Sequence, residues 1–406
     1  MSGVLEGLKV VAMEHMEAVP VATLWMADWG ADVLKIEPLT GDMFRGLQSA
    51  HGTSTDMKGE NAPVKWTFQL INRNKRSMAL NLKSEQGREV LYKLVENADV
   101  FMSNYTADAL KNLKADYAHM RKVNPKIVYA TISGYGSAGP DKDERGFDHA
   151  AGWARTGMQY MIGEPGSAPP RLPGGTIDRG VAAPHALAGV LAALYHRDRT
   201  GEGQEIEVSL FHSGVWAIAL PIQSALVGTP MPKDDRNKSA NPLYTVYRTK
   251  DDRWFQMSMI QPDPFWPGFC RALEKPELEN DPRFESMKKR DENREELIRI
   301  VDEVMATKTM AEWDPRFREA KLIYARVQNS TEVINDPQAL ANNFYVDLPH
   351  PQGTFKVVAT PVKFNQNPAE VTAPAPELGQ HTELALLDIG YDWEQIAKLK
   401  EDGAIL

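Results

Sequence analysis

Strand-like and helix-like patterns alternate along the first 135 residues of the chain. The apolar segments 8–13, 32–37, 77–82, 99–103 and 127–132 predict strands. Between them, residues 21–29 predict a helix that ends at Gly30, and Ser84 caps a helix that runs to about Asn97. Strands separated by helices of this length predict a parallel sheet with helices on both faces.

The pattern changes after Gly134. A loop rich in glycine and proline (163–176) is followed by an alanine-rich helix (179–196) and a strand (205–210). A polar linker (228–242) then leads to a hairpin (244–248 with 254–259). A charged helical stretch (292–320) follows, and the end of the chain (354–403) has one strand (355–359) and two short helices.

Length and composition narrow the class of protein. A chain of 406 residues is too long for one hydrophobic core, so we expect more than one domain. The single cysteine, Cys270, excludes a disulfide framework and a cysteine-based metal site within one chain. The beginning of the chain has no signal-peptide pattern and no apolar run is long enough to span a membrane, so we expect a cytoplasmic protein. A net charge of −9 argues against a nucleic-acid partner.

Two motif interpretations are rejected at this point. Residues 134–139 match G-x-G-x-x-G, but an acidic loop follows where a dinucleotide site needs a helix, so we expect a turn and no nicotinamide cofactor. The nine histidines contain no i, i+4 pair, and we expect no metal.

A run of basic residues surrounds the third predicted strand. Its members are Arg73, Lys75, Arg76, Lys83 and Arg88. Such a run is usually a solvated face. Alternatively, because it adjoins a strand of an open α/β sheet, it could hold the phosphates of a nucleotide-like cofactor.

Asp178 lies between a glycine-containing loop and the alanine-rich helix. The commoner role for an aspartate at such a boundary is a helix N-cap. The position also suits a nucleophilic carboxylate, because we expect the helix N-terminus to keep it ionised near neutral pH and the flanking glycines to admit an acyl group. The two roles are not mutually exclusive.

Several segments together resemble the class III coenzyme A transferases, the family that includes formyl-CoA transferase and carnitine CoA-transferase. The resemblance covers nearly the whole chain, and the order and spacing of the segments carry it. The matching segments are LEGLKVV at 5–11, WGADVLKIE at 29–37, Gly41-Asp42 with Arg45-Gly46, NKRS at 74–77, ADV at 98–100 with Asn104, SGYG at 133–136, GFD at 146–148, the Asp178 segment, LAALYHR at 191–197, TGEGQ at 200–204, PVKF at 361–364 and GQHT at 379–382.

The resemblance implies an α/β fold with a Rossmann-like large domain and a smaller α+β domain, in an interlocked, ring-shaped homodimer. Residues 1–225 and 331–406 would then build the large domain together, and residues 226–330 the small domain with its linkers. The implied partners are acyl-CoA and small carboxylic acids, with coenzyme A supplied as a substrate and no membrane involved.

The resemblance also implies roles for individual residues. Asp178 matches the catalytic aspartate, which would form an aspartyl–acyl anhydride and then an aspartyl-CoA thioester. His15, Met16, Glu17 and Ala18 match the loop after the first strand, and the N–H groups near Glu17 and Ala18 are candidates for stabilising an oxyanion. The matches near the nucleotide are Leu80, Lys83, Asn104, Tyr105 and Lys111, and the resemblance favours the anion-site interpretation of Arg73, Lys75 and Arg76.

Two departures from the family keep alternatives open. Pro38 stands where some members have an arginine that contacts the nucleotide, and the spacing from Asp178 to residues 191–194 is one residue longer than expected, closer to the α-methylacyl-CoA racemases. A racemase needs a base on each face of the α-carbon, and Phe147 replaces the histidine of that family's Gly-His-Asp motif, with His149 beyond it. Transfer is therefore favoured over racemisation, and a non-catalytic coenzyme A-binding protein is a further alternative.

The sequence says less about the acids that are exchanged. The chain resembles the transferases of aromatic or 2-hydroxy acids, particularly at 29–32 and 263–269. Methionines and a tryptophan could form an adaptable acyl pocket or could be ordinary core residues; they are Met13, Met16, Trp153, Met158 and Met161.

Overall fold

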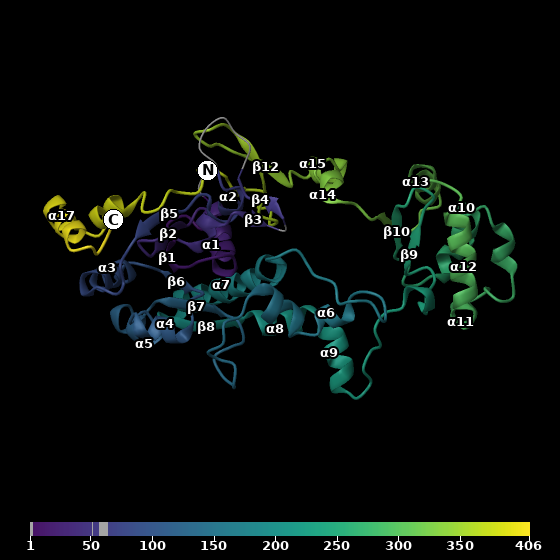
Figure 1. Cartoon of the computed structure of the whole chain (residues 1–406), viewed down its shortest axis with the longest axis horizontal. Coiled ribbons are helices and arrows are strands. Elements are labelled where there is room, and N and C mark those ends of the chain that lie inside the picture. The colour runs from purple at the N-terminus through teal and green to yellow at the C-terminus, as the bar shows by residue number, and fades with distance from the viewer. Residues whose placement is uncertain (1–2, 51, 57–63) are drawn as a thin grey trace. The chain divides into compact units, whose positions relative to one another are not determined.

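The computed structural model describes residues 3–50, 52–56 and 64–406 (Figure 1). The chain divides into a large unit, made of Met1–Gln159, Arg171–Pro230 and Leu340–Leu406, and a small unit, made of Tyr160–Pro170 and Met231–Ala339. The chain therefore passes between the units more often than the sequence suggested, because 160–170, expected in the large domain, belongs to the small unit.

A six-stranded parallel sheet forms the centre of the large unit, in the order β5-β2-β1-β6-β7-β8. The strands are β1 Lys9–Met13, β2 Asp32–Glu37, β5 Arg76–Ala79, β6 Val100–Ser103, β7 Val128–Ser133 and β8 Gln204–Ser209. Each lies within a few residues of a predicted strand, and the prediction of a parallel sheet is confirmed. Buried parallel strands are continuous apolar runs, which is why the sequence located them well.

Helices cover both faces of this sheet because side chains alternate along each strand. Val10 and its neighbours pack against α1 (Ala18–Asp28) and α7 (Ala183–Thr200) on one face. Val11 and its neighbours pack on the other face against α3 (Glu85–Glu96) and α5 (Tyr117–Val123). The chain's end also covers this second face, through α16 (Thr382–Asp388) and α17 (Trp393–Glu401) (Figure 1).

Shorter elements complete the large unit. They are the strand pairs β3 Ser49–Ala50 with β4 Thr53–Ser54 and β12 Tyr345–Leu348 with β13 Phe355–Val358, and the helices α2 Trp66–Asn72, α4 Ala107–Asn112, α8 Leu210–Ala217 and α9 Ala219–Leu226. Helix α6 Met158–Met161 begins in the large unit and ends in the segment 160–170 of the small unit. The sequence had predicted β13 but missed its partner β12, whose residues Tyr345–Leu348 are only partly apolar and mostly half-buried or exposed.

The small unit has an antiparallel sheet in the order β11-β10-β9. Its strands are β9 Val246–Arg248, β10 Trp254–Met257 and β11 Tyr324–Arg326, and its helices are α10 Trp266–Ala272, α11 Met287–Glu292, α12 Arg294–Met305, α13 Met310–Glu319 and α14 Ser330–Val333, with α15 Pro337–Ala341 at its end. The predicted hairpin is confirmed by the β9–β10 pairing. The predicted helical stretch 292–320 is divided, because Thr309 and Glu312 form a capping box that begins α13.

Candidate active site

Two π-helical turns lie beyond the carboxyl ends of the parallel strands. One, Asp148–Ala154, follows the turn after β7, and the other, Asp178–Ala182, leads directly into α7. The second turn packs against the first turn's neighbour α8 and against α1, which begins just after β1. Ligands bind at this end of open parallel sheets, and single π-helical turns are frequent at functional sites. The geometry therefore points to Asp178 and its surroundings.

The carboxylate of Asp148 caps the segment that carries Asp178. Asp148 Oδ1 accepts hydrogen bonds from the N–H groups of Ile177 (2.7 Å) and Asp178 (3.0 Å), and Oδ2 accepts one from Gly175 (3.1 Å). The Asp178 carboxylate makes no hydrogen bond with any residue that the structure describes. The interpretation of Asp178 as a helix cap is wrong, because Asp148 fills that role from a distant segment.

Burial and two neighbouring carboxylates, Asp148 and Glu17, raise the pKa of Asp178 to about 8, although Arg179 acts in the opposite direction. The expectation that the helix N-terminus keeps Asp178 ionised near neutral pH is therefore wrong. The N–H groups that would stabilise its charge are occupied by Asp148. Once ionised, a carboxylate with this pKa is a stronger base and a stronger nucleophile than an ordinary aspartate.

Glu17 pairs with Arg179 beside the nucleophile candidate. Arg179 Nη1 donates to Glu17 Oε2, and Arg179 Nη2 donates to the carbonyl oxygen of Gly174 at 2.6 Å. Gly175 makes this arrangement possible, since its φ is +75° and a Cβ there would collide with both Glu17 and Arg179. Burial raises the pKa of Glu17 even with the guanidinium present.

Side chains from two other segments hold the loop between β1 and α1. The Asn104 amide accepts the N–H of His15 (3.1 Å) and donates to the carbonyl of His15 (2.7 Å). Asp42 Oδ1 accepts the N–H of Met16 (3.1 Å), whose φ is +56°. Both ends of the Asn104 amide are therefore engaged with the protein, and its structural role is to position this loop.

His15 lies beneath this loop against the ring of Tyr105, with 5.1 Å between the ring centroids. Burial lowers the pKa of His15, and its Nδ1 has no hydrogen-bond partner among the described residues. The N–H groups of Glu17 and Ala18, at the start of α1, donate no hydrogen bond within the described part of the chain. These free donors fit the predicted stabilisation of an oxyanion.

Beneath the loop lies a buried group of charges, which we call the Glu14 network. Lys75 Nζ is 2.7 Å from Glu14 Oε1, Lys35 Nζ is 3.6 Å from the same oxygen, and Lys35 Nζ is 2.8 Å from Asp42 Oδ2. All four side chains are buried. Lys75 is thus engaged in the interior, where burial lowers its pKa to about 8, and it is not free to bind a phosphate.

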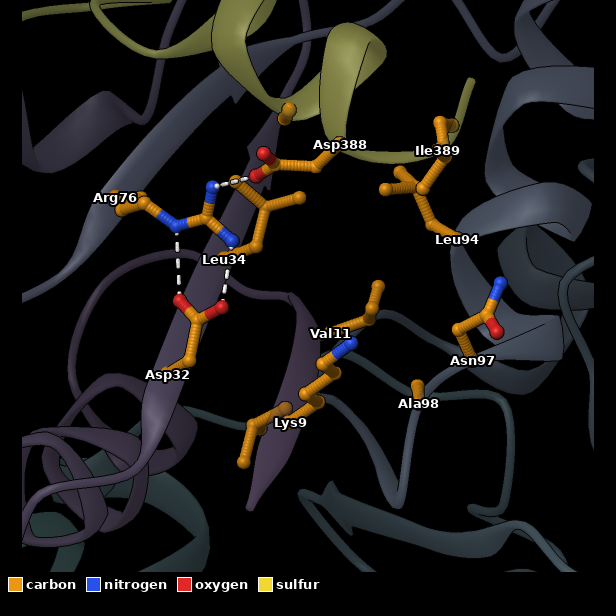
Figure 2. Close-up of a pocket in the computed structure, with 12 residues that line it drawn as sticks. Lys9, Val11, Asp32, Leu34, Arg76, Leu94, Asn97, Ala98, Asp388 and Ile389 are labelled. Atoms are coloured by element: carbon orange, nitrogen blue, oxygen red, sulfur yellow. Dashed lines mark hydrogen bonds and ion pairs between the residues drawn. The ribbon is translucent and has the colours of Figure 1, made fainter. Parts of the chain in front are cut away.

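Arg73 and Arg76 are likewise held by carboxylates. Arg73 is buried and forms a two-point ion pair with Asp28. Arg76 begins β5, at the amino end of the sheet, and bonds Asp32 and Asp388 at a polar pocket of about 340 Å³ (Figure 2). The expectation that Arg73, Lys75 and Arg76 form one phosphate site is wrong, because they point to different places and already have anionic partners.

The other predicted nucleotide contacts differ in accessibility. Leu80 is buried and bridges to Ile405 near the chain's end. Lys83 and Lys111 are exposed, follow β5 and β6 respectively, and form no salt bridge with the described residues. Arg88, also in the basic run, donates to the carbonyl oxygens of Leu82 and Lys83. Of the basic residues matched to the nucleotide site by resemblance, Lys83 and Lys111 remain available to an anionic ligand.

Comparison with known proteins decides the family. The sequence profile of CoA-transferase family III matches residues 5–382. The chain belongs to this family. It is 35% identical to (R)-2-hydroxy-4-methylpentanoate CoA-transferase of Clostridioides difficile, over 99% of both chains, and 34% identical to cinnamoyl-CoA:phenyllactate CoA-transferase of Clostridium sporogenes, over 100% of this chain and 98% of the relative. A CaiB/BaiF family protein from Brucella suis has a similar fold, with a TM-score of 0.83, 26% identity and coverage of 96% of this chain and 100% of the other.

The protein is therefore a class III CoA-transferase with a mixed α/β fold and a parallel central sheet. Sequence reasoning assigned no role to two residues of the transferase's site, Asp148 and Arg179. Asp148 lies within the GFD segment, which was matched only as part of a pattern. Arg179 directly follows Asp178 in the sequence, and this position next to the nucleophile candidate could have identified it as a site residue.

The core interpretation of the methionine-rich set holds for most of its members. Met13, Trp153 and Met158 are buried, and the last two pack with Ile177 behind the Asp178 turn. Met16 is only half-buried and sits in the loop after β1. Among the described residues, no group of three or more histidine, cysteine or carboxylate side chains is arranged to hold a metal ion.

Proposed function

We propose that this transferase moves coenzyme A between organic acids through covalent intermediates on Asp178. The ionised carboxylate attacks the carbonyl carbon of an acyl-CoA, the C–S bond breaks, and an aspartyl–acyl anhydride and coenzyme A thiolate form. The thiolate then attacks the aspartyl carbonyl and releases the donor acid, leaving an aspartyl-CoA thioester. The acceptor carboxylate attacks this thioester, and the same steps in reverse give the new acyl-CoA.

One observation carries the proposal: the Asp178 carboxylate has no hydrogen-bond partner among the described residues, while Asp148 performs the capping role. The two neighbouring carboxylates also oppose its ionised form. Acylation removes that charge, so the repulsion favours the covalent intermediates over the free carboxylate. The N–H groups of Glu17 and Ala18 make no hydrogen bond to the described residues and lie at the start of the helix that packs on the Asp178 turn, which supports a role for them in stabilising the developing oxyanion.

For the substrates, we propose 2-hydroxy acids or aromatic acids. This proposal is supported by the two relatives named above, one for (R)-2-hydroxy-4-methylpentanoate and one for cinnamoyl-CoA and phenyllactate. We further propose that Lys83, Lys111 and Tyr105 contact the nucleotide part of coenzyme A, that His15 and Met16 border its thioester end, and that the enzyme is an interlocked homodimer. Leu80 is 1% exposed and offers no surface to the nucleotide. No helix of the described chain is long and apolar enough to cross a membrane, and a cytoplasmic location stays a prediction from composition.

The racemase alternative is less well supported. Phe147 occupies the place of that family's histidine and is 54% exposed, while His149 Nε2 lies 2.8 Å from the carbonyl oxygen of Leu172. A racemase would exchange the α-hydrogen of an acyl-CoA with deuterated solvent when no acceptor acid is present. A non-catalytic protein would bind coenzyme A with neither exchange nor a covalent adduct.

Intact-protein mass spectrometry tests the proposal. Incubation with a 2-hydroxyacyl-CoA or cinnamoyl-CoA is expected to add the mass of coenzyme A to the enzyme, and hydroxylamine or borohydride treatment to modify Asp178. Asp178→Asn is the matched control and is expected to give no adduct. Absence of an adduct from the wild-type enzyme, with measurable turnover, would contradict the covalent mechanism.

A further inference from the structure

The charges around Asp178 are unequal in number. Three carboxylates, Asp148, Asp178 and Glu17, influence one another there, and Arg179 is the cation that acts on Asp178. The free acid in the proposed reaction arrives and leaves as a carboxylate next to Asp178. A carboxylate entering a partly buried site that already holds acidic groups needs a cationic partner, because desolvation of an unpaired charge is costly.

Arg179 has the hydrogen-bonding capacity to be that partner. Its side chain is 34% exposed, compared with 13% for Glu17, so part of the arginine side chain is accessible. Glu17 and the carbonyl of Gly174 use two of the five N–H groups that a guanidinium carries. Nε–H makes no hydrogen bond with any described residue. The planar fork of an arginine matches a carboxylate and binds it at two points.

Glu17 shows what this guanidinium can hold. Its carboxylate is already bound by Arg179, on the side of Gly175 where no side chain intrudes. In the absence of substrate this internal carboxylate occupies the guanidinium.

We propose that Arg179 is the residue that binds the carboxylate of the free organic acid, and that Glu17 occupies the guanidinium until that acid arrives. This inference rests on the proposed transfer through Asp178 and names the group that recognises its acid substrate. In the cycle, the acid's carboxylate lies on Arg179 when it is free and becomes neutral when it joins Asp178 in the anhydride, so the ion pair forms and breaks at each half-reaction.

Steady-state kinetics of Arg179→Gln test this role. We expect the KM for the acceptor acid to rise about tenfold or more, since a charge-assisted, two-point contact is lost. The KM for the acyl-CoA donor is expected to change by less than about threefold, because that substrate arrives without a free carboxylate at the reacting carbon. Arg179→Lys, which keeps the charge but loses the fork, is expected to fall between the two.

Glu17→Gln separates acid binding from a purely structural role. If Arg179 only holds Glu17, then Glu17→Gln raises the acid's KM as much as Arg179→Gln does, and the proposal is overturned. If Arg179 binds the acid, Glu17→Gln leaves that KM unchanged or lowers it, because the guanidinium loses a competing anion. Arg179→Gln alone leaves the Glu17 carboxylate without its cationic partner and could fail to fold. The double variant Glu17→Gln/Arg179→Gln removes both charges and controls for this effect. It is expected to show the same raised KM for the acid.

The coenzyme A adduct distinguishes failure of this inference from failure of the proposed function. Arg179→Gln is expected to form the adduct from acyl-CoA, since that half-reaction consumes no free acid. An adduct combined with an unchanged KM for the acid would overturn the role of Arg179 alone. Absence of the adduct from the wild-type enzyme would instead refute covalent transfer through Asp178.

Discussion

The large unit contains two groups of buried charge that resolve the same problem in opposite ways. In the Glu14 network, two ammonium groups face two carboxylates, and burial that by itself would raise the pKa of Asp42 is outweighed by Lys35 and by N–H donors, so this pKa is lowered. Around Asp178, burial and the charges of Asp148 and Glu17 outweigh Arg179, and the pKa of Asp178 rises to about 8. Partnered charges fix the loop after β1, while the poorly partnered one is left reactive.

The largest effect is expected from removing the poorly partnered charge. Asp178→Asn should lower transfer activity about a thousandfold or more, because the nucleophile is lost. The same change should stabilise the fold, since burying an uncompensated carboxylate is unfavourable. Because folding raises the pKa of this carboxyl group, the wild-type protein loses folding stability as the pH rises from about 4 to about 8.

The thermal unfolding midpoints of Asp178→Asn and wild type should therefore diverge with pH. We expect the variant's advantage to grow between pH 5 and pH 8 and then to level off. Equal midpoints across this range would contradict the raised pKa. Loss of activity with a lowered midpoint at every pH would indicate a structural role instead.

Removing one charge from the Glu14 network should lower the stability of the fold. Glu14→Gln leaves the buried Lys75 ammonium without its carboxylate, and we expect the free energy of unfolding to fall by about 3–5 kcal/mol. Denaturant or thermal unfolding measures this. The double variant Glu14→Gln/Lys75→Met removes both charges and should recover part of the loss. A double variant as unstable as the single one would show that the pair's charge is not what matters.

The smallest effect concerns the pH dependence of the rate. Because Asp178 attacks only when ionised and its pKa is about 8, kcat/KM for the acyl-CoA should fall about tenfold per pH unit below that value. Glu17→Gln removes a neighbouring negative charge and should move the midpoint to lower pH. A kcat/KM that is level from pH 5 to pH 7 would contradict the raised pKa of Asp178 in the free enzyme.

The fold and the candidate nucleophile were identified from the sequence for different reasons. The parallel strands are apolar runs because both faces of the sheet are covered, and periodicity alone reveals them. Asp178 was identified through resemblance, since its local context equally fitted a helix cap. The choice between those two roles depended on Asp148, whose carboxylate lies 30 positions away in the sequence from the N–H of Asp178.

The basic run was misinterpreted because the sequence shows the sign of a charge and not its partner. Arg73 pairs with Asp28, Lys75 with Glu14 and Arg76 with Asp32, at sequence separations of 45, 61 and 44 residues. These three side chains lie close together in the sequence at the start of β5, but they point in different directions and contact different parts of the large unit. Lys83 and Lys111 stay exposed, and no local signal separated them from the others.

The sequence by itself determined the alternating α/β order, the strands of the central sheet and the family, because buried strands and the order and spacing of family-like segments can be read along a linear chain. Only the tertiary structure decided which charges are partnered. Folding brings Asp148 to the N–H groups before α7 and Glu17 to Arg179, while Lys35 and Lys75 are drawn to Glu14. An aspartate's pKa depends on such neighbours and on burial, and both exist only after distant segments meet.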